Sequence, residues 1–275
     1  MKNNKFLLYV VIGFALLALP MGLQVFGNAW VRIVDTALLY VLLAIGLNIV
    51  VGYAGLLDLG YVAFFAVGAY MYALLASPHL SNTFEWIAAI YPHGIHVPIL
   101  LVIPLAAAVA ALFGVLLGAP TLKLRGDYLA IVTLGFGEII RVFLNNLDHP
   151  VNITNGPKGL SAIDAFQIFG VDMSRSFGVF GMEFTSVAMY YYLFLIMVLI
   201  SIVLSHRLAL SRVGRAWMAI REDEIAAKAM GINTRNLKLL AFGMGASFGG
   251  VSGALFASFQ GFVSPESFTL MESVM

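Results

Sequence analysis

The chain has 275 residues, of which 61% are apolar and only 11% charged, and its mean hydropathy is +0.96. A water-soluble domain carries about 25% charged residues, so this composition indicates an integral membrane protein. A formal net charge of +1 argues against a nucleic-acid binder. The lack of cysteine excludes disulfides, thiolate metal sites and cysteine nucleophiles.

The first 20 residues, MKNNKFLLYVVIGFALLALP, place two lysines before an apolar run. A secretory signal peptide has a similar pattern. No convincing cleavage site of small residues follows Pro20, however, and further apolar segments come downstream. We therefore interpret this segment as a retained first transmembrane helix.

Seven segments are candidates for membrane spans, which need about 20 apolar residues each. They are 6–23, 33–51, 61–76, 98–119, 129–147, 187–205 and 239–260. The third is short and follows the glycine-rich GYAGLLDLG at 52–60, which favours a broken or re-entrant element. A tight cytoplasmic turn is the alternative. The predicted fold class is all-α, a polytopic membrane helix bundle.

The positive-inside rule orients these spans. With a cytoplasmic N-terminus, the inner side carries Lys2, Lys5, Lys123, Arg125 and seven basic residues between 206 and 238. The outer side carries only Arg32, Lys158 and Arg175. We therefore predict that the N-terminus and loops 120–128 and 206–238 are cytoplasmic, and that loops 77–97 and 148–186 are outside.

Loop 148–186 is too long to be a simple connection between two spans. It contains Gly and Pro turn signals and a short amphipathic element near 162–169, which together predict a cap over the membrane core. We find no linker, low-complexity run or obvious repeat, and so we predict one domain over 1–275.

Ionisable residues inside spans are costly and are therefore functional candidates by default. Glu138 and Arg141 lie three residues apart, so they share a helical face and can pair. The alternative is structural: an ion pair that pins helices, and an Asp58 carboxylate that caps a broken helix. The candidate translocation residues are Asn48, Gly52, Gly55, Asp58, Gly60, Glu138 and Arg141.

Three other motifs resemble parts of enzyme sites, but each lacks a feature that such a site requires. His93 and His96 have a ligand-like spacing but no nearby third ligand. Gly245, Gly249 and Gly253 recur every four residues within a span, which predicts close helix packing. Because NGPKGL at 155–160 lacks the frame of a phosphate loop, no segment supplies a nucleotide site, and any ATP must be handled by another chain.

The segment 206–238 concentrates the charges of the chain. Ser211 can cap a helix start, and 222–230 favours a short helix with acids first and Lys228 near its end. Gly231 then stops the helix. Ala226, Ala227, Ala229 and Met230 supply small apolar surface, and the alanines let a partner backbone approach. A solvated charged loop is the alternative.

AAKAMG at 226–231 resembles the Glu-Ala-Ala-x-x-x-Gly loop of ABC importer permeases, which forms the helix that docks into the ATPase. Ile225 stands at the usual glutamate position, and Glu224 lies one residue earlier. The wider sequence resembles the LivM-type permeases of branched-chain amino-acid ABC importers. The matching stretches are 46–70, 125–141, 154–160, 211–232 and 253–268.

This resemblance implies a bacterial inner-membrane permease subunit that is not an enzyme and holds no cofactor. It implies four kinds of partner: a homologous second permease, two cytoplasmic ATPases that hold ATP and Mg²⁺, a periplasmic binding protein, and membrane lipid. The residues expected to couple to the ATPases are Arg215, Arg221, Glu224, Ala226, Ala227 and Gly231. Relatives continue beyond the position matching Met275, so C-terminal spans are expected to be missing.

The implied substrates are leucine, isoleucine and valine. Permeases of urea and short-chain amide importers are similar, and they form the alternative within the same class. From other classes, an ion-coupled secondary transporter and an integral membrane enzyme remain alternatives. The five histidines are scattered, and neither an inverted repeat nor a midplane carboxylate pair is clear.

Overall fold

The computed structural model of this chain describes residues 2–122, 124, 126–168, 171–173, 177–179, 182–269, 271 and 273. The long helices are α1 (Lys2–Gln24), α2 (Asn28–Asn48), α3 (Val62–Leu75), α6 (Ile99–Thr121), α7 (Asp127–Asn146), α8 (Ser186–Leu210) and α11 (Thr234–Gln260). The shorter helices are η1 (Ile49–Tyr53), α4 (His79–Thr83), α5 (Glu85–Ile90), η2 (Gly156–Lys158), α9 (Arg212–Glu222), α10 (Glu224–Ala229) and η3 (Pro265–Ser267). The strands are β1 (Leu160–Ser161), β2 (Gln167–Ile168), β3 (Val171–Asp172), β4 (Phe177–Val179), β5 (Met182–Phe184) and β6 (Phe262–Val263).

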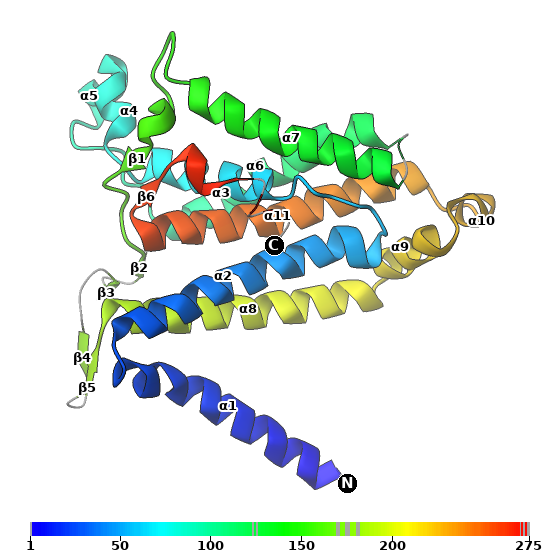
Figure 1. The fold of residues 1–275 in the computed structure, drawn as a ribbon, viewed down its shortest axis with the longest axis horizontal. Coiled ribbons are helices and arrows are strands. Elements are labelled where there is room, and N and C mark those ends of the chain that lie inside the picture. Colours follow the sequence, from blue (N-terminus) through cyan, green and yellow to red (C-terminus); the bar gives the residue numbers. More distant parts are fainter. Residues whose placement is uncertain are drawn as a thin grey trace.

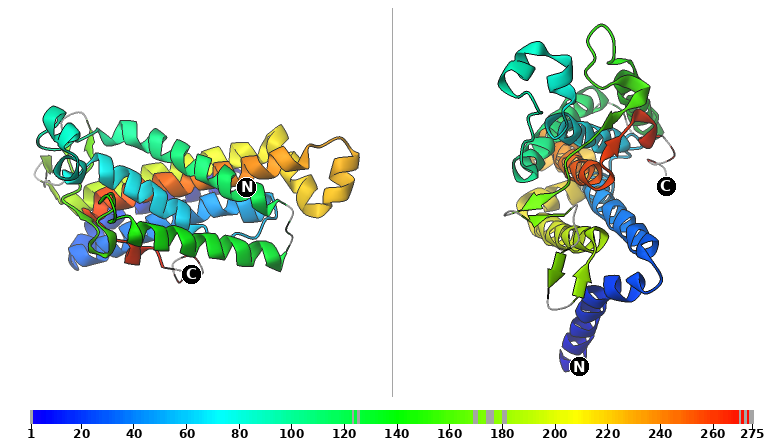
Figure 2. Two further views of the ribbon diagram at one scale, coloured as in Figure 1. Left: turned by 90° about the horizontal axis from the view of Figure 1, so that it is seen from above. Right: turned by 90° about the vertical axis from the view of Figure 1, so that its left-hand side faces the viewer.

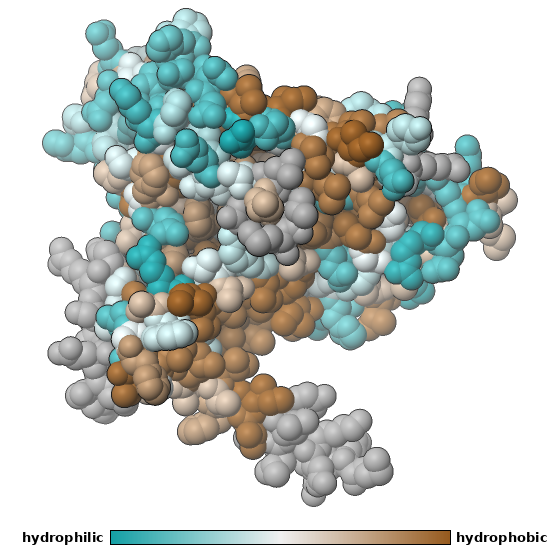
Figure 3. All heavy atoms as spheres, viewed as in Figure 1, coloured by the Kyte–Doolittle hydropathy of each residue, from teal (hydrophilic) through white to brown (hydrophobic). Residues whose placement is uncertain are grey.

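The seven long helices coincide with the seven predicted spans, which confirms the all-α membrane bundle. By length and composition, four described helices can cross a membrane: α2 continued through η1, then α6, α8 and α11. Helices α1 and α3 contain shorter apolar stretches. The surface agrees, because polar residues gather at the two ends of the bundle and apolar residues cover the middle (Figure 3).

The ends of the helices fall into two groups (Figure 1). The start of α1 and the helices α9 and α10 lie at one end, and α4, α5 and the strands lie at the other. Figure 2 shows α9 and α10 projecting beyond the long helices. The loops therefore share ends as predicted. Lys123, Arg125 and Arg175 lie outside the described residues, as do the side chains of Lys2 and Lys5.

Helix α1 diverges from the other helices toward its N-terminus (Figure 1). Pro20 lies inside it and has no N–H, so the carbonyl of Leu16 loses its helical partner. The Tyr191 hydroxyl donates to Leu16 O at 2.8 Å, and Tyr192 donates to Leu17 O at 2.9 Å. The helix is thus held to α8 where its own hydrogen bonding is interrupted.

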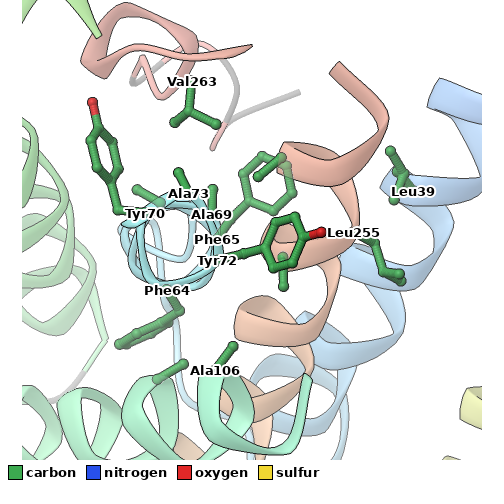
Figure 4. Packing of buried hydrophobic residues seen from close by; sticks show 14 of the residues in the cluster. Leu39, Phe64, Phe65, Ala69, Tyr70, Tyr72, Ala73, Ala106, Leu255 and Val263 are labelled. Carbon is green, nitrogen blue, oxygen red and sulfur yellow. The ribbon is translucent and has the colours of Figure 1, made fainter. Parts of the chain in front are cut away.

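Helix α11 packs against α2, α3 and α6 through its glycines. A Cβ added at Gly253 would collide with the backbone of Phe65. A Cβ added at Gly249 would lie 3.0 Å from the Cβ of Phe64. Figure 4 looks along α3 and shows Phe64 pointing toward α6, while Phe65 and Tyr72 point toward α11. The predicted helix-packing role of the glycine repeat is confirmed.

Loop 148–186 pairs with the distant segment that follows α11. Strand β1 is antiparallel to β6, with Leu160 opposite Val263. Residues 162–166 have no regular structure, and the N–H of Asp164 bonds Ala76 O at 2.9 Å. The described part of the amphipathic element predicted near 162–169 is therefore irregular, with φ +56° at Ala162, and ends in the short strand β2. Backbone pairing with remote segments outweighs local periodicity here; Phe169 lies outside the described residues.

Candidate functional site

We call residues 206–238 the charged loop. It contains α9 and α10, and each begins at a capping side chain: Ser211 Oγ accepts from Gly214 N at 3.1 Å, and Asp223 Oδ1 accepts from Ile225 N at 2.8 Å. Gly231 has φ +85° and ends the loop's second helix. The Ser211 cap and the glycine stop are confirmed. The predicted helix over 222–230 is split, because Asp223 starts a new helix.

The two alanines expected to face a partner point in different directions. Ala226 is exposed, whereas Ala227 is 4% exposed and packs against this chain. The expectation that Ala227 faces a partner was therefore wrong. Helix α10 has six residues and is attached at both ends, so one of its faces packs against the neighbouring segments of the chain, and Ala227 lies on that face. The outward apolar surface comes instead from Ile225, 71% exposed, and Met230, 84% exposed. The sequence interpretation named Met230 as apolar surface but not Ile225, whose signal was a large apolar residue at the start of a charged helix.

Glu224 ties α10 to the first turns of α11. Its carboxylate lies 2.8 Å from Lys238 Nζ, and these side chains are 25% and 7% exposed. A buried cation is costly unless it is paired, so the contact keeps α10 close to the start of α11. The sequence singled out Glu224 but missed Lys238 as its partner, because the two are 14 positions apart.

The two arginines expected to act in coupling have different contacts. Arg215 donates to Leu210 O at 2.8 Å, next to the start of its own helix. Arg221 donates from Nη1 to Gly52 O at 2.7 Å and also pairs with Glu222. Arg221 therefore joins the charged loop to residues 52–60, which we call the glycine-rich break.

The glycine-rich break is confirmed as an interruption between α2 and α3. Helix α2 widens into a π-helical turn, η1, that contains Gly52. The chain then leaves helical geometry at Gly55, with φ +68°, and returns into the bundle before α3 (Figure 1). Asn48, the last residue of α2, is exposed, and its side chain lies against Gly52.

Asp58 is 4% exposed within the break, and its Oδ1 accepts from Gly60 N at 3.0 Å. This contact closes a local turn inside the break. Helix α3 begins after Tyr61 without a side-chain cap, so the capping role considered from the sequence is not what the structure shows. The other carboxylate oxygen has no hydrogen-bond partner among the described residues, and Asp58 borders a small cavity with Thr133 and Phe242. The carboxylate is therefore half satisfied, in a place where polar groups are normally paired.

The break packs directly against α7. Leu59 N donates to Thr133 Oγ1 at 3.0 Å, and a Cβ at Gly60 would collide with Thr133 O. Thr133 was not recognised from the sequence, because a threonine inside a span has no distinguishing pattern. Gly60 is thus required by space, since backbone meets backbone.

Glu138 and Arg141 form the predicted local pair on α7. Nη2 of Arg141 lies 2.6 Å from Oε1 of Glu138, and Nε donates to the same oxygen at 3.0 Å. The side chains are 41% and 31% exposed, and Glu138 lines a second small cavity with Leu59 and Val62. The pair therefore borders the break, C-terminal along α7 to the contact that Thr133 makes with Leu59.

Asp35 is a candidate that the sequence interpretation missed. It lies in α2 with 0% exposure, and neither carboxylate oxygen has a hydrogen-bond partner among the described residues. The signal was present, since an aspartate falls inside the second predicted span. A larger cavity of about 610 Å³ lies on another face of α2 and is lined by Tyr40, Ala44, Tyr61 and Val62.

The histidine pair has a structural explanation. His96 Nδ1 donates to Asp164 Oδ2 at 2.6 Å, and its Nε2 lies 2.8 Å from His93 O. The Asp164 contact, and secondarily the His93 carbonyl, raises the pKa of His96 above its ordinary value of 6.5. The described residues contain no cluster of three His, Cys, Asp or Glu side chains suited to a metal ion.

Comparison with known proteins places these features in a family. The family described as "Branched-chain amino acid transport system / permease component" matches residues 29–274. The chain is 43% identical over 92% of its length to the high-affinity branched-chain amino acid transport system permease protein LivM of Salmonella typhimurium, and 44% identical over 88% to that of Escherichia coli. It is 26% identical over 82% of its length to the permease protein LivH of Salmonella typhimurium, covering 68% of that protein.

The chain spans 60% and 56% of the lengths of the two LivM relatives. No solved structure matches it. The family match covers most of the chain and includes both the glycine-rich break and the charged loop. The chain therefore belongs to the permease component family of branched-chain amino acid transport systems and is a multi-pass membrane protein.

Proposed function

We propose that this chain is a transmembrane permease subunit of an ATP-driven importer for leucine, isoleucine and valine. The observation that carries the proposal is the outward apolar surface formed by Ile225 in α10 and Met230 directly after it. A short helix with exposed large apolar side chains in water is a feature of protein contact sites. Its position beyond the membrane helices suits a contact with a soluble ATPase (Figure 2).

ATP and Mg²⁺ are held by partner ATPase subunits in this proposal, because the sequence contains no phosphate-loop frame. The resemblance to two differently named permeases, LivM and LivH, supports pairing with a second homologous permease. A periplasmic binding protein completes the assembly and delivers the amino acid. The proposed path through this subunit passes the glycine-rich break and the Glu138–Arg141 pair.

We place the protein in the bacterial inner membrane with a cytoplasmic N-terminus. Support comes from the basic residues that gather in the charged loop, which lies at the same end of the bundle as the start of α1 (Figure 1). A cysteine introduced at Arg215 tests this, because the chain has no other cysteine. An impermeant thiol reagent added to intact cells should leave this cysteine unlabelled. Labelling from outside would show that the proposed orientation is wrong.

Substrate class is tested by uptake of labelled leucine into vesicles that contain the complete complex. We expect uptake that requires ATP and the binding protein and that excess urea does not reduce. Transport of urea without leucine would overturn the proposed substrate while keeping the importer. Leucine uptake driven by an ion gradient without ATP would overturn the importer itself.

A further inference from the structure

Arg221 connects two regions that are 169 positions apart in sequence. It lies four residues after Trp217, which is fully buried among Ile49, Val50 and Ala54 at the junction of η1 and the break. The same face of α9 therefore presents both side chains to the break. Trp217 also donates to Leu237 O at 2.7 Å, which anchors α9 on the start of α11.

The carbonyl groups at the end of η1 need hydrogen-bond donors, and Arg221 provides one. The last carbonyls of a helix have no intrahelical N–H partner and carry the negative end of the helix dipole. Gly52 O is in this position, and Arg221 Nη1 reaches it at 2.7 Å. A charge-assisted hydrogen bond of this kind is stronger than one between neutral groups.

The stem of Arg221 fits against a second glycine. A Cβ at Gly55 would collide with Cγ of Arg221, so the side chain and the turn are in direct contact. Gly55 also has φ +68°, which favours glycine. Arg221 thus contacts the break at two points, one polar and one by packing.

Beyond Gly55, the break and Tyr61, the residue that follows it, are attached to two long helices. Leu59 N donates to Thr133 of α7, and the Tyr61 hydroxyl donates to Gly245 O of α11 at 2.6 Å. A displacement of α9 therefore has a continuous set of contacts through which to reach the middle of the bundle. This route differs from a direct push on α8 and α11, the helices that flank the charged loop.

We propose that Arg221 is a positioning residue that transmits movement of the charged loop to the glycine-rich break, and through it to α7. This inference rests on the proposed function, because it takes α10 as the contact with an ATPase. It adds that the break, rather than only the flanking helices, receives the movement. Coupling of this kind requires that the break changes its arrangement when the ATPases bind nucleotide.

The test uses a reporter at Leu57, which lies in the break and is 40% exposed. Leu57→Cys supplies the sole thiol of the chain, and its rate of labelling is measured in the purified complex without nucleotide and after trapping with ATP and vanadate. We expect the rate to differ between these two states. If a complex that imports leucine shows the same labelling rate in both states, this inference is wrong while the proposed function stands.

Arg221→Met keeps the apolar stem and removes every donor. We expect it to abolish the nucleotide-dependent difference at Leu57→Cys and to lower leucine imported per ATP about fivefold or more. Arg221→Lys, which keeps a cation near Gly52 O, should recover part of both. Arg212→Met is the matched control, since Arg212 is an exposed arginine at the start of the same helix, and it should behave as the unaltered chain.

A nucleotide-dependent difference that persists in Arg221→Met would overturn the inference. Equal loss in Arg212→Met would do the same, because it would point to the charge of the loop in general. Should Arg221→Met fail to assemble, Arg221→Leu, which also lacks a donor, is judged by the same criteria. Labelling needs no substrate, so a complex that shows the difference but does not import leucine would overturn only the proposed function.

Discussion

The charged loop and the glycine-rich break both use glycine to redirect the chain, but for different physical reasons. Gly231 has φ +85°, and an added Cβ would meet no atom within 4 Å. The φ angle of Gly60 lies outside the left-handed region, yet an added Cβ would collide with the backbone of Thr133. One glycine is required by conformation at an open surface, and the other by space inside the bundle. Substitution of the two glycines should therefore cause losses that depend on different properties of the new side chain, its volume at Gly60 and its backbone preference at Gly231.

Gly60→Ala should have the largest effect, because the collision involves backbone on both sides and α7 must move. We expect a loss of about 3 kcal/mol of stability, the upper range for overpacking, together with loss of transport. Thermal unfolding in detergent and leucine uptake would measure both. Gly135→Ala, on α7 with open space around it, is the control and should be neutral or slightly stabilising. Equal behaviour of the two variants would remove the spatial explanation.

Ala227→Asp and Ile225→Asp separate the inner and outer faces of α10. The first places a carboxylate at a position 4% exposed, so the chain itself should lose about 2 kcal/mol of stability. The second alters a side chain that is 71% exposed and should leave stability unchanged while weakening ATPase binding. Unfolding and co-purification with the ATPases test this. The opposite pattern would mean that Ala227, not Ile225, faces the partner.

Gly231 substitutions should follow backbone preference rather than side-chain volume. Alanine in the left-handed region costs about 1 kcal/mol, valine more, and asparagine less. We therefore expect ATPase association to decline in the order Asn, Ala, Val. If Gly231→Asn proved as damaging as Gly231→Val, then space at this surface would matter after all.

The His96–Asp164 pair, far from both glycine regions, should have the smallest effect. Because its partner raises the pKa of His96, the pair stabilises the fold fully below about pH 6.5, and this contribution is lost as pH rises through the raised value. The side chains are 43% and 35% exposed, so the contribution stays below about 1 kcal/mol. Asp164→Asn should lower the Tm more at pH 6 than at pH 9. A deficit that grows with pH would contradict this sign.

The sequence alone identified the features that depend on nearby residues. The seven long helices follow from long apolar runs, the Ser211 cap and the Gly231 stop from neighbouring backbone groups, and the Glu138–Arg141 pair from helical spacing. Each of these involves atoms within a few positions of one another, so a local pattern contains the necessary information.

Only the tertiary structure decided which remote surfaces meet. It buried Ala227, and it buried Asp35 with no hydrogen-bond partner for its oxygens in the part of the chain that the structure describes. It also paired Glu224 with Lys238 and placed the Arg221 guanidinium against Gly52 O. These outcomes depend on how whole helices pack, and packing is a property of the complete set of side chains rather than of any single segment. A residue's own neighbours in the sequence do not determine which helix will cover it.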